Sequence, residues 1–176
     1  MIVPTKLRVS LKPLITVDAT CLGLNQLIAE GEQTDFPLSK WLEKILIMGK
    51  EKILFTPQHT LSFGFIRGNE YQDEERFSET IDADALRSGG HLPMAGDAFI
   101  LGCKIKPATL KDLGLRTFVL MHEPMTDLCF TRDKFRLGLC FESNGKHRLE
   151  ACYGRVGGGR FPDTGFVYLM NPPLKL

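Results

Sequence analysis

The sequence predicts an α+β domain with a mixed β-sheet and a few packed helices, and three observations lead to that class. Short apolar runs rich in β-branched and aromatic residues recur along the chain, as they do in strands. Fewer stretches show the spacing of three and four residues between apolar positions that marks a helix. Glycine and proline end most of these runs, and the strand-like and helix-like runs follow one another in mixed order.

The bulk numbers describe an ordered globular protein. The 176 residues match the usual size of one domain, and 43% of them are apolar and 24% charged. No internal repeat or low-complexity tract is visible. We therefore interpret residues 1–176 as a single domain with a long polar surface insertion around residues 67–96, in which one short helix can form.

Charge and cysteine content exclude several classes of protein. A net charge of +1 excludes a bulk polycation, so any contact with nucleic acid must come from a local basic patch such as residues 146–160. The five cysteines are odd in number and lack a Cys-x-x-Cys pair, which favours reduced thiols over a disulfide framework or a zinc ribbon. The N-terminus lacks the apolar core of a signal peptide, and apolar runs such as Ile45–Met48 are too short to span a bilayer. The sequence thus predicts a cytoplasmic protein without a membrane partner.

The elements before the insertion are predicted from local signals. A break at Pro13 divides the first strand region, and Asp18 can cap a helix that ends near Gly31. A second helix has a plausible cap at Ser39. The predicted elements are strands over 5–17, 52–56 and 61–66, and helices over 18–31 and 39–49.

The second half of the chain is predicted to be rich in strands. Its elements are strands over 99–105, 116–121, 127–130, 135–142 and 165–170, a helical turn over 109–113 ended by Gly114, and a helix over 148–156. Ser88–His91 and Asp163–Gly165 are interpreted as turns. His122 and Glu123 are too sparse for a metal site, and we interpret them as structural or solvated.

The junction at residues 143–153 carries the strongest functional signal. An apolar strand leads into the turn Asn144-Gly145, and a helix is predicted to begin near His147. The first N–H groups of such a helix lack helical partners, and its dipole is positive at that end. Lys146, His147 and Arg148 add cationic donors at the same point. The junction therefore predicts an anion site, most simply for a phosphate; the alternative is a surface helix with unfavourable charges in its first turn.

The run Asn-Gly-Lys-His-Arg-Leu-Glu-Ala-Cys at residues 144–152 also resembles the signature of the ParB/sulfiredoxin superfamily. The resemblance covers residues 136–170, about a fifth of the chain. It implies nucleotide binding, with phosphates surrounded by Asn144, Gly145, Lys146, His147 and Arg148. Asn144 replaces the aspartate of kinase-like members and Lys146 the reactive cysteine of sulfiredoxins, so neither chemistry is expected.

Within that superfamily, the centromere-binding members carry a helix-turn-helix domain after this module, and none is expected here. The compact Osa-like fertility-inhibition proteins remain as the expected relatives. That resemblance implies a plasmid-encoded inhibitor of conjugative DNA transfer, acting through ATP hydrolysis and DNA cleavage. The implied partners are a nucleotide, DNA and a protein of the conjugation machinery, and the implied cofactors are ATP and Mg²⁺.

Each candidate residue has a predicted role. Lys146 and Arg148 would stabilise phosphate charge, His147 or Glu142 would handle a proton or water, and Glu142 would also hold Mg²⁺. Arg155 and Arg160 would contact the DNA backbone, or else be solvated loop residues. Glu150 is expected to point away from Arg148 on the helix. The alternative function is a non-catalytic nucleotide- or DNA-binding module that blocks a partner.

Overall fold

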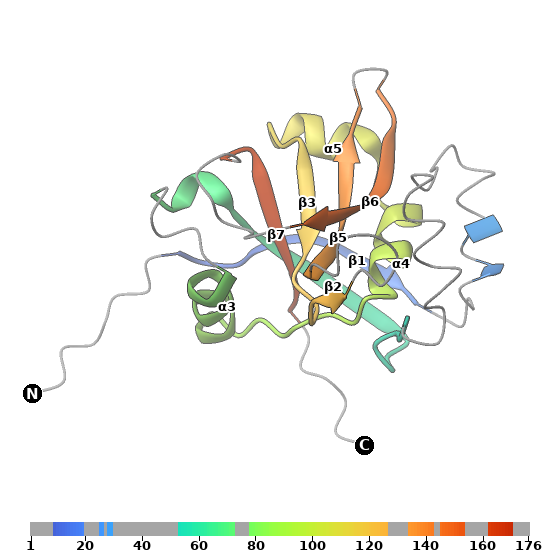
Figure 1. The fold of residues 1–176 in the computed structure, drawn as a ribbon, viewed down its shortest axis with the longest axis horizontal. Coiled ribbons are helices and arrows are strands. Elements are labelled where there is room, and N and C mark those ends of the chain that lie inside the picture. Colours follow the sequence, from blue (N-terminus) through green and yellow to red (C-terminus); the bar gives the residue numbers. More distant parts are fainter. Residues whose placement is uncertain are drawn as a thin grey trace, which may run out of the picture.

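The computed structural model describes residues 9–19, 25–26, 28–29, 53–72, 78–126, 134–142, 145–153 and 162–170. These residues form an α+β fold in which one mixed sheet carries helices, so the predicted fold class is confirmed (Figure 1). The predicted helix over 39–49, the strand over 127–130 and most of the helix over 18–31 lie outside the described residues. No helix of the described part is long and apolar enough to cross a membrane.

The described elements agree with most of the predicted strands. They are β1 (Lys12–Asp18), β2 (Thr60–Arg67), the 3-10 helix η2 (Gly68–Glu70), α3 (Ser78–Arg87), α4 (Asp97–Lys104), α5 (Pro107–Asp112), β3 (Thr117–Leu120), β4 (Met125–Thr126), β5 (Lys134–Phe141), β6 (His147–Tyr153) and β7 (Thr164–Leu169). Predicted strands correspond to β1, β2, β3, β5 and β7, and the predicted turn at Gly114 ends α5 with a φ of +66°. The strand predicted over 52–56 is wrong, because the described residues 53–56 are not in a strand.

The sheet is antiparallel except at one pair of strands. Its order is β1-β2-β7-β3-β5-β4, and β6 pairs with β5. β3 runs parallel to β7, and the other pairs are antiparallel. β1 takes its place at one end of this order with a register shift between Pro13 and Ile15, as a proline within a strand favours.

Strand alternation divides the interior into two apolar cores. Successive residues of β7 point to opposite faces, so Val167 and Leu169 belong to one core and Phe166 and Tyr168 to the other. We call the first the α4 face, because α4 packs on it. The second is the α3 face, where Ile81 and other residues of α3 pack.

Helix α4 replaces a predicted strand over 99–105, and that prediction was wrong. Residues 97–102 are all buried, so their apolar run has no exposed side from which a period can be recognised. The start of α4 is held by Asp97, whose carboxylate accepts hydrogen bonds from Met94 N at 2.9 Å, Thr56 N at 3.0 Å and Thr56 Oγ1 at 2.6 Å. These bonds satisfy the buried charge and fix the entry of the chain into the helix.

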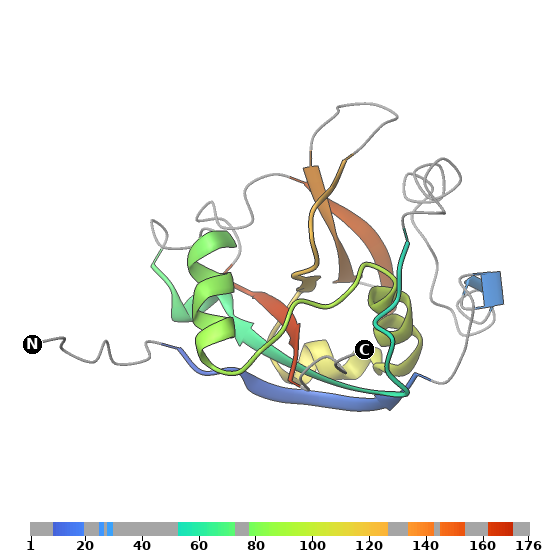
Figure 2. The ribbon, with the colours of Figure 1, turned by 90° about the horizontal axis from the view of Figure 1, so that it is seen from below.

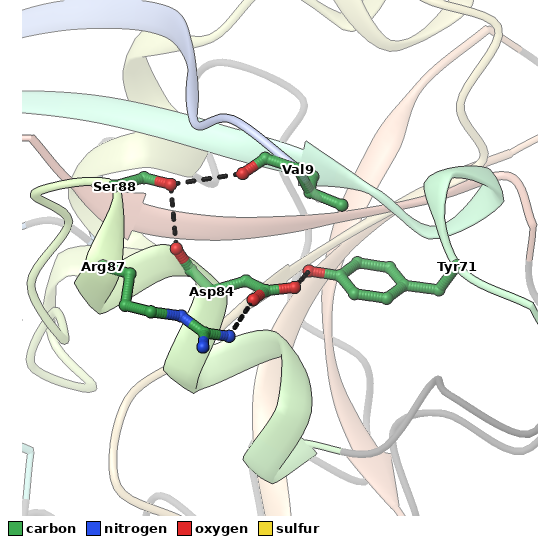
Figure 3. A network of polar contacts seen from close by, with 5 residues as sticks. All are labelled: Val9, Tyr71, Asp84, Arg87 and Ser88. Carbon is green, nitrogen blue, oxygen red and sulfur yellow. Dashed lines mark hydrogen bonds and ion pairs between the residues drawn. The ribbon is translucent and has the colours of Figure 1, made fainter. Parts of the chain in front are cut away.

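The segment predicted as a polar insertion contains α3, which packs on the sheet. Figure 3 shows the polar contacts that hold this helix. Asp84 accepts a hydrogen bond from Tyr71 Oη at 3.1 Å and pairs with Arg87. The Ser88 hydroxyl lies 2.8 Å from Asp84 O and 3.3 Å from Val9 O, which ties the end of α3 to the N-terminal segment. Burial, with Asp84 next to the ring, raises the pKa of Tyr71.

From α3 the chain crosses to α4 in an extended segment, visible in Figure 2. His91 forms a two-way backbone bridge with Leu169, with N···O distances of 2.8 and 2.9 Å. Residues 67–96 are polar in composition, which predicted a surface insertion. The described part of this segment instead packs on the sheet through α3 and bonds to it through His91.

Candidate functional site

The predicted phosphate-binding junction is a β-hairpin. His147–Tyr153 forms β6, which pairs with β5 from Phe141↔His147 to Phe135↔Tyr153. The helix predicted over 148–156 is therefore wrong over its described part. The helix dipole and unpaired N–H groups that predicted an anion site do not occur at His147.

The turn of this hairpin explains the difference. Gly145 N donates to Glu142 O at 3.0 Å, Glu142 N donates to Lys146 O at 2.8 Å, and Gly145 has a φ of +85°. A turn followed by a left-handed glycine is a common hairpin connection. Asn144-Gly145 between two apolar runs was the sequence signal for it, whereas the spacing of Leu149 and Cys152 suggested a helix.

His147 lies in the interior. Its side chain is buried, and Nε2 donates to the carbonyl of Gly102 in α4 at 3.0 Å. Burial lowers the pKa of His147, so the ring is neutral at neutral pH. The side chain therefore fastens β6 to α4 and is separated from the surface that Lys146 occupies.

Arg148 is held by two carboxylates on its own face of the hairpin. Its Nη1 lies 2.8 Å from Glu142 Oε1, and its Nη2 pairs with Glu150. In a strand, residues two apart share a face, so the prediction that Glu150 points away from Arg148 was wrong. The charge of Arg148 is thus offset locally, and Glu142 is bound to Arg148 rather than presented alone to a metal ion.

Exposed cations gather instead around the turn end of the hairpin. Phe141 N donates to Arg116 O at 2.8 Å, which places Arg116 beside the end of β5, and its side chain is 81% exposed. α5 contacts β5 and ends just before Arg116, and the bond from His147 to Gly102 brings the end of α4 to the same place. We call this surface the basic end; its exposed cations are Lys104, Lys106, Lys111, Arg116 and Lys146.

Figure 1 shows α5 and the turn end of the hairpin at the top of the view and α3 at the lower left. The basic end therefore lies at the opposite end of the molecule from α3.

The basic end also contains carboxylates. Asp163 approaches Arg116 Nε at 3.8 Å, and Asp112 is exposed. The long exposed side chains of the five cations still reach solvent, each from a different element or connection. Sequence reasoning selected Lys146 but missed the cations of residues 104–116, because only the topology brings them to the hairpin.

A second polar cluster lies at the other end of β5, on the α3 face. Asp82 accepts a hydrogen bond from Tyr168 Oη at 2.7 Å and pairs with Arg136 Nη2 at 3.4 Å. Arg136 Nε donates to His122 O at 2.9 Å. Burial raises the pKa of Asp82 and Tyr168.

His122 belongs to this buried cluster as a structural residue. Its Nε2 accepts a hydrogen bond from Leu137 N at 2.8 Å, so Nδ1 carries the proton and donates to Glu123 O at 2.6 Å. Burial lowers the pKa of His122 to about 4. Both ring nitrogens are therefore used by the backbone, in agreement with the structural interpretation of this residue.

The remaining predicted site residues have no described position. Asn144, Arg155 and Arg160 lie outside the described residues. Among the described residues, no group of three or more His, Cys, Asp or Glu side chains could hold a metal ion. The roles of Glu142, Lys146, His147 and Arg148 in ATP hydrolysis, and of Glu142 in Mg²⁺ binding, stay predictions.

Three comparisons with known proteins bear on the family of the chain. No protein-family model, no curated protein and no solved structure matches it. The resemblance of residues 144–152 to the ParB/sulfiredoxin signature stays a prediction, and the helix that it implied there is the strand β6.

Proposed function

We propose that the protein is a binding module that holds the phosphate backbone of DNA at the basic end. The observation that carries the proposal is the gathering of exposed lysine and arginine side chains from α4, α5, the start of β3 and the β5–β6 turn. These side chains come from distant parts of the sequence, and they meet at one end of the sheet. This function is the non-catalytic alternative of the sequence analysis.

The charges of the molecule support this choice of partner. With a net charge of +1, attraction to a polyanion has to be local. The end near α3 carries the exposed acids Glu79 and Glu123 and one exposed lysine, Lys134, while its arginines Arg87 and Arg136 are paired with aspartates. A DNA backbone approaching the molecule is therefore attracted to the basic end and repelled by the opposite one.

The strength and character of the expected binding follow from counterion release. Each phosphate contact contributes about −0.9 to the slope of log K against log salt concentration. Contacts by the exposed cations of the basic end give a slope of about −4 with duplex DNA if most of them take part. Contacts of this kind depend on the backbone, so the affinity should vary little with DNA sequence.

The test is fluorescence anisotropy with a labelled 20-base-pair duplex over a range of salt concentrations. Lys111→Ala and Arg116→Ala should each weaken binding and reduce the salt slope by about 1. Lys134→Ala is the matched control, because Lys134 is an exposed lysine at the opposite end of β5. Lack of binding at low salt, or an equal loss in the Lys134 variant, would overturn the proposal.

A parallel assay separates binding from the enzymatic function that the family resemblance implies. ATP turnover and plasmid nicking are measured with Mg²⁺ for the wild type and for Lys146→Ala. The binding proposal expects neither activity in either protein. ATP turnover or nicking by the wild type that is lost in Lys146→Ala would contradict the binding proposal and support an enzymatic function.

A further inference from the structure

The two faces of the β5–β6 hairpin can be assigned from its register. Leu139 of β5 is directly opposite Leu149 of β6, and both belong to the core of the α4 face. Successive residues of a strand point to opposite faces, and directly opposite residues share one. Arg148 and Glu150, which flank Leu149, therefore lie on the α3 face. The turn end of the hairpin thus has two sides, which we call the α4 side and the α3 side.

The α4 side holds most of the cations of the basic end. α4 and α5 both pack on the α4-face core, and Phe141, whose N–H donates to Arg116 O, packs against the same core. The exposed cations on these elements and their connections are Lys104, Lys106, Lys111 and Arg116. They outnumber the carboxylates beside them, Asp112 and Asp163. Lys146 belongs to the turn itself, so exposed positive charge is concentrated on the α4 side and at the turn.

The α3 side carries one cation between two carboxylates. Arg148 Nη1 lies 2.8 Å from Glu142 Oε1, and Arg148 Nη2 pairs with Glu150 Oε1. The side chains of all three residues are partly exposed, by 41% for Arg148, 27% for Glu142 and 28% for Glu150. One guanidinium and two carboxylates leave a formal charge of −1, so this cluster presents a net negative charge to solvent.

The contacts of Arg148 leave its guanidinium little freedom to bind a phosphate. Its Nε is buried, and the two nitrogens that remain are the ones that pair with Glu142 and Glu150. A phosphate that approached would have to displace a carboxylate from a charge-assisted hydrogen bond of similar strength. The displaced carboxylate would then lie next to the phosphate and repel it. Arg148 therefore holds the two carboxylates in place and does not offer its charge to DNA.

We propose that duplex DNA crosses the α4 side of the hairpin turn, and that Glu142 and Glu150 exclude the DNA backbone from the α3 side. The inference rests on the proposed function and adds the side from which the DNA approaches. Like charges brought face to face cost free energy, so they exclude a wrong arrangement even where they contribute nothing to the right one. Glu142 and Glu150 are thus specificity-determining residues that mark the border of the DNA contact.

The test repeats the salt titration of the 20-base-pair duplex with variants of the α3 side. Glu142→Gln/Glu150→Gln removes both negative charges and keeps the size of the side chains, so Arg148 should become a further phosphate contact. The affinity at low salt should rise by about fivefold or more, and the salt slope should become steeper by about 1. Glu79→Gln is the matched control, because it removes an exposed carboxylate of α3, far from the basic end, and it should leave the slope unchanged.

A double-mutant comparison separates a contact by Arg148 from a general effect of charge. Arg148→Ala should leave the salt slope of the wild type unchanged, and in the Glu142→Gln/Glu150→Gln background it should return the slope to the wild-type value. An equal gain from the two glutamines with or without Arg148, or no gain at all, would overturn this inference alone. A wild type that binds no duplex at low salt would overturn the proposed function and this inference with it.

A second measurement observes the α3 side directly. The NMR signal of the Arg148 Nε–Hε group in the ¹⁵N-labelled protein is followed during titration with the duplex. It should stay in place in the wild type while the amides of residues 104–116 shift, and it should move in the Glu142→Gln/Glu150→Gln variant. A shift of the Arg148 signal in the wild type at the same DNA concentration contradicts the inference, and this result does not depend on the folding of any variant. Exposed ion pairs contribute little to stability, so the variant should unfold at about the temperature of the wild type.

Discussion

The two ends of β5 use charged residues in opposite ways. At its start, Arg136 is buried and bound to Asp82 and to a backbone carbonyl, and Tyr168 completes the cluster. At its turn end, Lys146 and Arg116 are exposed. A buried charge must be satisfied inside the protein, whereas an exposed charge can be satisfied by a partner. The comparison assigns the first cluster to stability and the second to binding.

The largest expected effect comes from breaking the buried cluster. Arg136→Met removes the cation and leaves the carboxylate of Asp82 without its ion pair. We expect a loss of about 3 kcal/mol in the free energy of unfolding, measured by urea denaturation. Arg116→Met is the matched control and should change stability by less than about 0.5 kcal/mol. Equal losses in the two variants would remove the distinction between the ends.

Acid should destabilise the protein through the same cluster. The pKa of His122 is about 4 when folded, against 6.5 when unfolded. The contribution of neutral His122 to the free energy of unfolding is therefore fully present above pH 6.5. It is lost as the pH falls towards 4, which lowers the free energy of unfolding by about 3 kcal/mol.

The measurement is the free energy of unfolding between pH 7.5 and pH 4 for the wild type and for His122→Asn. Asp82 and Asp97 have raised pKa values, so their contributions change with pH in the opposite direction in both proteins. The difference between the two curves isolates His122. Parallel curves would show that the pKa of His122 is the same in the folded and the unfolded protein, which contradicts the account.

The turn of the hairpin provides a smaller and more specific effect. Gly145→Ala places a side chain at a φ of +85°, where no neighbour lies within 4 Å but the backbone is strained. We expect a loss of about 1 kcal/mol of stability. If residues 147–153 were helical, alanine in place of glycine near the helix start would not carry this cost, so an unchanged or increased stability argues against the turn.

The smallest effect on stability should accompany a clear effect on binding. Lys146→Ala removes an exposed side chain and should change the free energy of unfolding by less than about 0.5 kcal/mol. Its affinity for duplex DNA should fall at low salt, with a salt slope reduced by about 1. A destabilised Lys146→Ala protein with normal DNA binding would reverse the roles assigned to the two ends.

Much of the fold could be predicted from local patterns. β2, β3, β5 and β7 are apolar runs of strand length, and these runs were recognised. Helix α4 was not recognised as a helix, because six of its eight residues are buried and its apolar positions do not alternate with exposed polar ones. The helix–strand ambiguity of short apolar runs can be resolved only by the contacts that the run makes.

The candidate site was less predictable than the fold. Residues 147–153 carry Leu149 and Cys152 at a helical spacing, but the partner strand β5 selects a period of two and buries His147 and Leu149 together. The cations at residues 104–116 belong to other elements, and their nearness to Lys146 follows from α4, α5 and β3 meeting the hairpin. Contacts between residues that are far apart in the sequence cannot be recognised from the local pattern of a single sequence.

The most direct test of the account is an NMR titration of the ¹⁵N-labelled protein with a short DNA duplex at low salt. The account predicts that the amide shifts that change most belong to residues 104–116 and 145–147, and that α3 and residues 134–136 change little. The changes should disappear when salt is added. Shifts centred on α3 and the Asp82–Arg136 cluster, or no shifts at all, would contradict the assignment of binding to the basic end.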